Sequence, residues 1–111
     1  MKWVEMIRGR SSSGALAAAL HPISAQAREI TRVPDVVDAM VLTHALFDGD
    51  LAVVLLWDNE RHPVKTREGL MIAENLEQYG LVDHAVWVVA PGFGCHVEGQ
   101  ANATEGDRGC R

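Results

Sequence analysis

The chain has 111 residues, which is the length of a single domain. Apolar residues make up 48% of it, enough to form a core, and the formal net charge of −5 argues against a nucleic-acid-binding protein, which normally carries a basic face. No apolar run approaches the roughly 18 residues that a membrane-spanning helix needs, so no membrane partner is expected.

The amino-terminal segment has two interpretations. Residues 2–8 alternate between polar and apolar side chains, which predicts a first strand. Basic residues followed by the apolar run 15–20 also resemble a secretory signal. Because Glu5 interrupts the basic part and Pro22 follows the apolar run closely, we favour the strand, and with it a cytoplasmic protein.

A first helix is predicted from residue 16 to residue 30, because apolar residues recur there at spacings of four and three. Pro22 lies inside this stripe and must either kink the helix or restart it, since its ring clashes with the carbonyl group four residues earlier. The stripe continues past the proline, so a kink is the expectation.

A hairpin is predicted next, because two apolar runs, 39–47 and 50–57, flank Asp48-Gly49. A two-residue turn would place His44 opposite Val53. One face of the hairpin would then carry Met40, Leu42, His44, Leu46, Leu51, Val53, Leu55 and Trp57. The other face would also be apolar, whereas a sheet with one face in water should alternate. The hairpin is therefore expected to be covered on both sides.

The last elements are a helix and a strand. Thr66 is a plausible N-cap for a helix over residues 67–79, and Gly80 follows that helix as a C′ glycine. Residues 83–90 form an apolar run that predicts the final strand. Residues 92–111 are rich in glycine and lack any period, so they are interpreted as a flexible tail.

These elements predict an α+β domain over residues 1–91, with the ferredoxin-like order βαββαβ. Two helices can cover one face of a four-stranded antiparallel sheet, but they cannot cover both. A second copy of the chain is the natural cover for the other apolar face, which would make a homodimer by sheet-on-sheet packing.

The run from Leu51 to Asp58, the polar loop after it, the helix that follows Thr66, and Gly80-Leu81-Val82 resemble the dimeric α+β barrel superfamily in order and length. Within it, the chain is similar to the antibiotic-biosynthesis-monooxygenase-like domains. The resemblance implies a ferredoxin-like fold and a homodimer over residues 1–91. It implies less about function, because the superfamily includes haem-degrading enzymes, stress-responsive proteins and ligand-sensing modules.

Trp57 stands where this family often places a tryptophan that lines a ligand cavity between the sheet and the helices. Relatives that are cofactor-free oxygenases often pair it with an asparagine on the same strand, but Leu55 and Val53 occupy those positions here. Haem-degrading relatives pair it with a histidine of the second helix, and residues 67–79 contain none. Core packing and a cavity wall both remain open for Trp57.

His44 is the sharpest single candidate for chemistry, because the predicted register places it mid-strand on the face of Trp57. Glu5 on the first strand could accept its N–H, and a Glu–His pair in an apolar cavity could transfer protons. The alternative is a histidine whose hydrogen bonds serve only the core or a subunit contact. His62 and His84 fall near element ends and are expected to lie in solvent.

Neither a metal nor a cofactor is expected. No H-x-H or H-x-x-x-H spacing occurs, and Cys95-His96 offers at most two ligands. Cys95 and Cys110 are the only cysteines, so disulfides do not hold the core together, and unpaired thiols are expected.

The leading hypothesis is a homodimeric domain that binds a small apolar or aromatic ligand. Its site would combine His44 and Glu5 as catalytic residues with four ligand contacts: Trp57, Leu42, Leu55 and Trp87. One alternative is a cofactor-independent monooxygenase that acts on a phenolic or quinone-like substrate. The other is a structural or regulatory dimer without a ligand.

Overall fold

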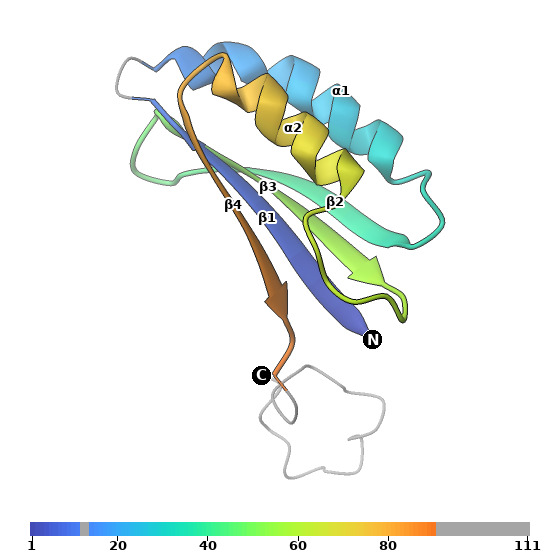
Figure 1. Cartoon of the computed structure of the whole chain (residues 1–111). Helices are drawn as coiled ribbons and strands as arrows, with labels where there is room; N and C mark the ends of the chain where they lie inside the picture. Colours follow the sequence, from blue (N-terminus) through green and yellow to red (C-terminus); the bar gives the residue numbers. More distant parts are fainter. Residues whose placement is uncertain (12–13, 91–111) are drawn as a thin grey trace, which may run out of the picture.

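The computed structural model describes residues 1–11 and 14–90 of the chain. The strands are β1 (Lys2–Arg10), β2 (Val36–Thr43), β3 (Asp50–Asp58) and β4 (Leu81–Val88). The helices are the short 3₁₀ helix η1 (Ala15–Ala19) and the α-helices α1 (Leu20–Ile30) and α2 (Arg67–Glu77) (Figure 1). The tail expected over residues 92–111 lies outside the described residues.

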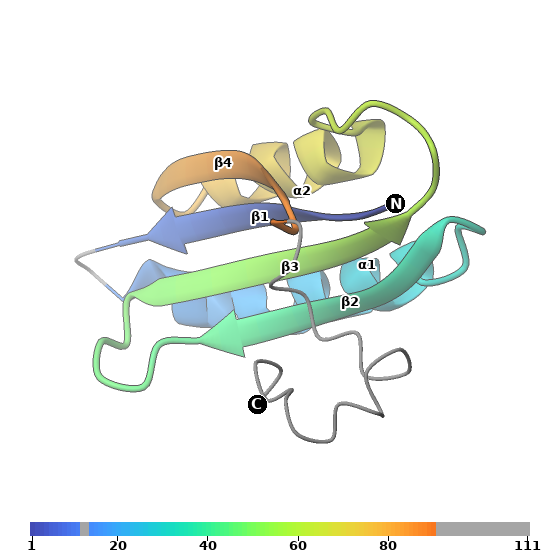
Figure 2. The ribbon, with the colours of Figure 1, turned by 90° about the horizontal axis from the view of Figure 1, so that it is seen from below.

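The four strands form one antiparallel sheet in the order β2-β3-β1-β4. Both α-helices lie on the same face of this sheet, as the view in Figure 2 shows, with the strands in front of the helices. The chain therefore has the α+β, ferredoxin-like βαββαβ fold that the order of its elements predicts, with two helices on one face of a four-stranded sheet.

The core lies between the sheet and the helices. Alternate residues of β1 and β3 point to this inner face, because side chains along a strand alternate between the two faces. They meet the apolar stripes of η1, α1 and α2. The largest fully buried apolar side chains are Trp3, Ile7, Leu16, Ile23, Val53, Leu55, Ile72 and Leu76. Burying a side chain of this kind contributes roughly 1.5–3 kcal/mol, so this layer dominates the stability of the fold.

The first helix restarts at Leu20, two residues before Pro22, and does not kink at the proline. The 3₁₀ helix ends at Ala19 and α1 begins at Leu20, so Pro22 lies in the first turn of α1. The missing N–H of proline costs little in a first turn, because N–H groups there have no partner within the helix. The apolar stripe still continues across the junction, since Leu16 of η1 and Ile23 of α1 are both buried.

The register of the β2–β3 hairpin differs from the prediction. Leu42 pairs with Ala52 instead of Leu55, a shift of 55 − 52 = 3 residues. Strand β2 ends at Thr43, so residues 44–49 form a connection that is longer than the predicted two-residue turn. The side chain of His44 organises this connection, because its Nδ1 accepts the backbone N–H groups of residues 46 and 47, at 2.9 and 3.2 Å.

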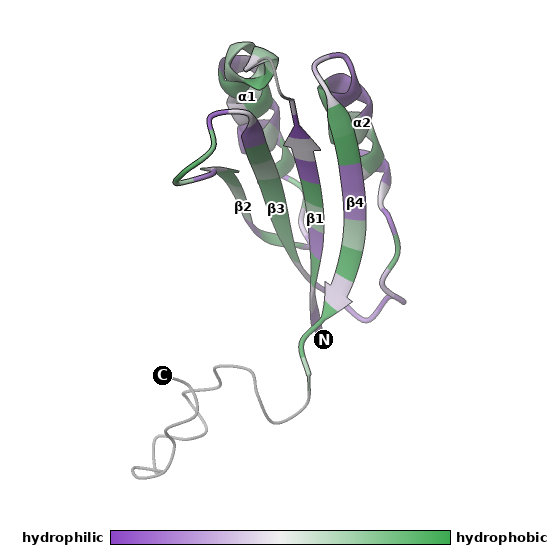
Figure 3. Ribbon diagram, turned by 90° about the vertical axis from the view of Figure 1, so that its left-hand side faces the viewer, coloured by the Kyte–Doolittle hydropathy of each residue, from purple (hydrophilic) through white to green (hydrophobic). Residues whose placement is uncertain are grey.

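An odd shift of register moves a strand's side chains to the opposite face. Leu42 consequently lies on the outer face of the sheet, away from the helices, whereas Leu55 and Trp57 lie on the inner face. The predicted grouping of these three residues on one face is wrong. Strand β3 is hydrophobic along most of its length in Figure 3, so the prediction that both faces of this hairpin are apolar is confirmed.

Gly80 has a different role from the one expected of a C′ glycine. Its φ is not positive, since Gly14 is the one glycine with a positive φ in the described part of the chain. A Cβ atom on Gly80 would lie 2.3 Å from the backbone carbonyl oxygen of Arg10. The glycine is therefore required by the close approach of the chain to the end of β1.

None of the helices described is both long and apolar enough to cross a lipid bilayer.

Candidate functional site

Glu5 is a fully buried carboxylate in the middle of β1, on the inner face of the sheet. Its Oε1 accepts the indole N–H of Trp57 at 3.1 Å and the hydroxyl of Thr66 at 2.7 Å. Its Oε2 accepts the backbone N–H of Thr66 at 2.9 Å and lies 2.6 Å from Nε2 of His84. A carboxylate removed from water requires such partners, and Glu5 has them on both oxygens.

The sheet register brings these side chains together. Glu5 pairs directly with Leu55 of β3 and with Val86 of β4. Trp57 and His84 are the diagonal neighbours, two residues along each partner strand, and therefore share the inner face with Glu5. Glu5 thus joins the two strands that flank β1.

The amino-terminal end of α2 closes the cluster. Thr66 is the N-cap of α2, because its hydroxyl oxygen accepts the backbone N–H of Gly69 at 3.0 Å while its own O–H is directed to Glu5. A Cβ atom on Gly69 would lie 1.9 Å from Oε2 of Glu5, so only glycine leaves room for the carboxylate. The partial positive charge of the helix amino terminus also stabilises the negative charge of Glu5.

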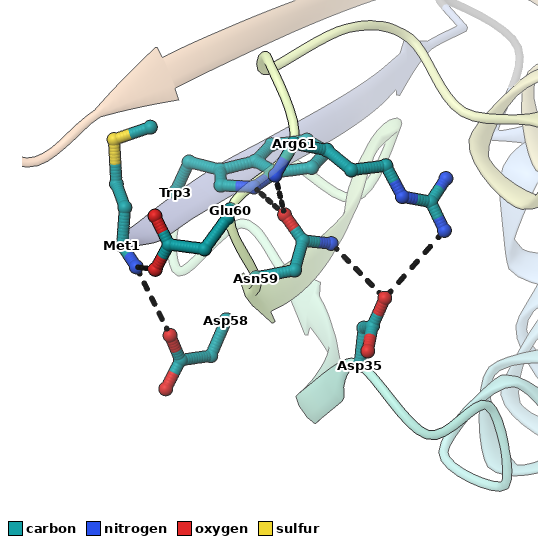
Figure 4. Close-up of polar contacts among 7 residues, drawn as sticks. All are labelled: Met1, Trp3, Asp35, Asp58, Asn59, Glu60 and Arg61. Carbon is teal, nitrogen blue, oxygen red and sulfur yellow. Dashed lines mark hydrogen bonds and ion pairs between the residues drawn. The ribbon is translucent and has the colours of Figure 1, made fainter.

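Trp57 stacks on Trp3, with the ring centroids 5.5 Å apart and the planes inclined by 13°. The indole N–H of Trp3 donates to Oδ1 of Asn59 at 3.0 Å. Asn59 in turn donates to Oδ2 of Asp35 at 3.2 Å, and that oxygen lies 3.5 Å from the guanidinium of Arg61 (Figure 4). Both indole rings are therefore held in place by the hydrogen bonds that their N–H groups donate.

A cavity of about 330 Å³ lies beside this indole pair. Trp3 and Trp57 are among its lining residues, although only 1% and 3% of their surfaces are exposed, and the connection between β3 and α2 together with the first turn of α2 supplies its rim. The charged side chains of that rim are Arg61, Lys65, Arg67 and Glu68. The site is thus an aromatic wall beneath a predominantly cationic rim.

The structure brings only some of the predicted site residues together. Trp57 lines this cavity, Leu55 is buried on the same face of the sheet, and Glu5 holds Trp57 through its indole N–H. Leu42 and Trp87 lie on the outer face, where 46% and 59% of their surfaces are exposed. These two residues cannot contact a ligand in the cavity beside Trp57.

The expected pair of Glu5 with His44 is wrong. His44 follows the end of β2, is exposed, and lies at the end of the sheet opposite to the Trp3–Trp57 pair. It lines a separate depression of about 280 Å³ against η1, together with Leu16. The physical reason is the shorter β2, which leaves His44 in the loop and turned toward the backbone N–H groups of that loop.

His84 is the residue that sequence reasoning missed. It was expected in solvent at the start of the last strand, but only 6% of its side chain is exposed. Strand β4 begins at Leu81, so His84 lies within the strand and faces inward, like Val82 and Val86. The alternation of Val82, His84 and Val86 was a signal for this placement. His62 is exposed as expected, and it lies on the rim of the cavity.

In the part of the chain that the structure describes, no three His, Cys, Asp or Glu side chains gather in an arrangement that could hold a metal ion. Cys95 and Cys110 lie outside that part.

The fold is shared with several solved structures, whereas no family model and no curated protein matches the sequence. A candidate antibiotic biosynthesis monooxygenase from Nitrosomonas europaea superimposes with a TM-score of 0.62 at 10% identity, covering 84% of this chain and 94% of that one. A similar candidate from Deinococcus radiodurans gives 0.61 at 12% identity, with 85% and 97% covered.

A mutant of SnoaB, a cofactor-independent oxygenase from Streptomyces nogalater, gives a TM-score of 0.57 at 14% identity, covering 79% of this chain and 92% of that one. The chain therefore shares the ferredoxin-like fold of these antibiotic-biosynthesis-monooxygenase-like structures. At these identities the likeness establishes the fold and leaves the activity to the site.

Proposed function

We propose that the chain is a homodimeric domain that binds a small, flat, apolar or aromatic ligand in the cavity beside Trp57. The observation that carries this proposal is the stacked pair of Trp3 and Trp57, whose nitrogen atoms are both held from within the protein. Because Trp3 and Trp57 are only 1% and 3% exposed, a ligand would pack against the small part of each ring that borders the cavity, and a wall fixed in this way loses little conformational freedom on binding. The volume of about 330 Å³ suits a small molecule, since ligand pockets usually measure roughly 300–1,000 Å³.

The outer face of the sheet supports the homodimer. Met40 and Leu42 are 42% and 46% exposed there, and Trp87 is 59% exposed, although all three are large and apolar. The apolar centre of this face consists of Val4, Met6, Met40, Leu42, Ala52, Val54, Leu56, Ala85 and Trp87. Monomeric proteins rarely expose a continuous patch of this kind, and a second copy of the same sheet would cover it.

A binding test can use the three tryptophans of the chain, because their indole N–H groups give separate NMR signals. We expect 2-naphthol to shift the signals of Trp3 and Trp57, which line the cavity, and to leave that of Trp87 in place, since Trp87 lies on the outer face. If millimolar 2-naphthol moved only Trp87, or no indole signal, the proposed ligand site would be wrong.

A second candidate is a cofactor-independent monooxygenase that acts on a phenolic substrate. The buried pair of Glu5 and His84, 2.6 Å apart and hydrogen-bonded to the Trp57 wall, favours this reading because such a network can hold a proton one side chain from the cavity. His62, on the rim, is positioned to accept the phenol proton. His44 has no role in this scheme, because it lies at the other end of the sheet.

The oxygenase reading predicts a balanced reaction. One molecule each of 1,5-dihydroxynaphthalene and O₂ would give one 5-hydroxy-1,4-naphthoquinone and one water, with the ring oxidised and one oxygen atom inserted. We expect quinone absorbance and oxygen uptake in equal amounts, faster than in buffer alone, and slower with His62→Gln. If the protein did not change the rate of quinone formation, the oxygenase hypothesis would be rejected, whereas the proposed binding function would still stand.

A further inference from the structure

We infer that the cavity selects a flat aromatic acid, so that its ligand carries an oxyanion on an aromatic ring system. This inference rests on the proposed ligand site and adds the charge of the ligand to it.

The polar groups of Trp3, Trp57 and Thr66, three of the residues that line the cavity, are already engaged within the protein. The indole N–H of Trp57 donates a hydrogen bond to Glu5, and the indole N–H of Trp3 donates one to Asn59. The hydroxyl of Thr66, which also lines the cavity, is directed to Glu5 as well. A ligand would therefore pack against the small exposed parts of these rings and against Val33 and Val64, and the charged residues of the rim offer partners for its polar group.

The rim is cationic in a chain that is acidic as a whole. Arg61, Lys65 and Arg67 line the cavity, with Glu68 as the acid among the lining residues, whereas the entire chain carries a formal charge of −5. Arg61 is partly neutralised by Asp35, at 3.5 Å. Neither Lys65 nor Arg67 has an ion-pair partner in residues 1–11 or 14–90, and both are exposed.

The two properties together define the chemical class of the ligand. The aromatic wall and the volume of the cavity fit one or two fused rings, and the unpaired cations of Lys65 and Arg67 fit a carboxylate at the edge of those rings. Since exposed charge pairs contribute little individually and are screened by salt, we expect a preference of roughly three- to tenfold for the acid at low ionic strength.

The test compares 2-naphthoate with 2-naphthamide, which have the same rings and nearly the same shape but differ in charge. Both are titrated against the Trp3 and Trp57 indole N–H signals of the full chain, at low and at high salt. We expect naphthoate to bind several-fold more tightly at low salt and to lose this advantage at high salt. Lys65→Gln or Arg67→Gln should reduce naphthoate binding toward that of the amide, whereas Arg10→Gln, at the opposite end of the sheet, should not.

Each other outcome overturns a specific part of the inference. Equal binding of naphthoate and naphthamide at the two indoles would leave the aromatic cavity in place and reject the preference for an acid. Tighter naphthoate binding that survives both rim substitutions would reject the assignment to Lys65 and Arg67. If neither compound moved the signals of Trp3 and Trp57, the proposed function and this inference would fall together.

Discussion

Glu5 is the one charged residue that is fully buried among the described residues, and it makes its contacts with three different elements. It accepts hydrogen bonds from Trp57 of β3 and from Thr66 at the start of α2, and it contacts His84 of β4. Removing one partner from such a cluster leaves the others buried without compensation. The residues around Glu5 should therefore be unusually sensitive to small changes.

Glu5→Gln preserves the shape of the side chain but replaces one acceptor oxygen by an NH₂ group that faces donors. We expect a loss of roughly 1–3 kcal/mol in the free energy of unfolding, because at least one buried hydrogen bond is broken. Urea denaturation measures it, with Glu74→Gln, an exposed position of α2, as the matched control with no significant loss. A Glu5→Gln protein as stable as the control would show that the cluster contributes no net stability.

Gly69→Ala should lower the stability of the protein, whereas a glycine-to-alanine substitution within a helix usually raises it. Alanine normally stabilises a helix by about 1 kcal/mol relative to glycine. Here the new Cβ would lie 1.9 Å from Oε2 of Glu5, so we expect a destabilisation of about 2 kcal/mol, as is typical of an overpacked core. Thermal unfolding tests this, and adding Glu5→Ala should make the Gly69→Ala change far less harmful, since the clashing atoms are gone. A stabilised Gly69→Ala protein would refute the packing described for Glu5.

Individual elements were predictable from the sequence, but their register was not. The periodicity of apolar residues indicated all four strands and both α-helices, with boundaries off by a few residues. Asp48-Gly49 suggested a two-residue turn, but Gly49 instead allows the chain to approach the backbone of Ser11, which is distant in sequence. A Cβ atom on Gly49 would lie 1.9 Å from the carbonyl oxygen of Ser11, and the N–H of Ser11 donates to the Gly49 carbonyl. Local turn chemistry cannot reveal such an approach.

The candidate site was predicted as one group of six residues, and the structure brings only some of them together. Trp57 was selected from the family resemblance, and Glu5 as a carboxylate on a neighbouring strand that could pair with His44. The actual partner of Glu5 could not be predicted, because His84 is separated from it by 79 positions and meets it only through the register of β4 on β1. The N-cap role of Thr66 was predicted correctly, since it depends on neighbouring residues alone.

Thr66 joins α2 to the sheet, so its substitution should affect the whole helix. Thr66→Ala removes the cap of α2 and the hydroxyl that donates to Glu5, and we expect a loss of roughly 1–2 kcal/mol. Thr66→Ser keeps the hydroxyl and should retain most of the stability. Thermal unfolding monitored by circular dichroism compares the two variants. Equal losses in both would mean that the methyl group, rather than the hydroxyl, matters at this position.

At the scale of the whole molecule, the exposed apolar side chains on the outer face of the sheet are the basis for the proposed homodimer. We expect the protein to sediment as a homodimer at micromolar concentration, because a stable interface usually buries about 800 Å² on each partner and this face offers a continuous apolar centre. Leu42→Glu should convert the dimer to a monomer. Leu70→Glu, on α2 and 51% exposed, is the control that should remain dimeric. A well-folded wild-type monomer would contradict the sheet-on-sheet assembly.

Strand β4 is an edge strand of the sheet, and it carries the histidine that completes the partners of Glu5. Edge strands open more readily than central ones, and each opening of β4 would carry His84 away from the carboxylate. Glu5 also accepts the indole N–H of Trp57. We therefore expect opening of β4 to be coupled to loosening of Trp57 in the cavity wall. Hydrogen exchange of the β4 amides and of the Trp57 indole N–H should therefore slow together whenever a ligand occupies the cavity.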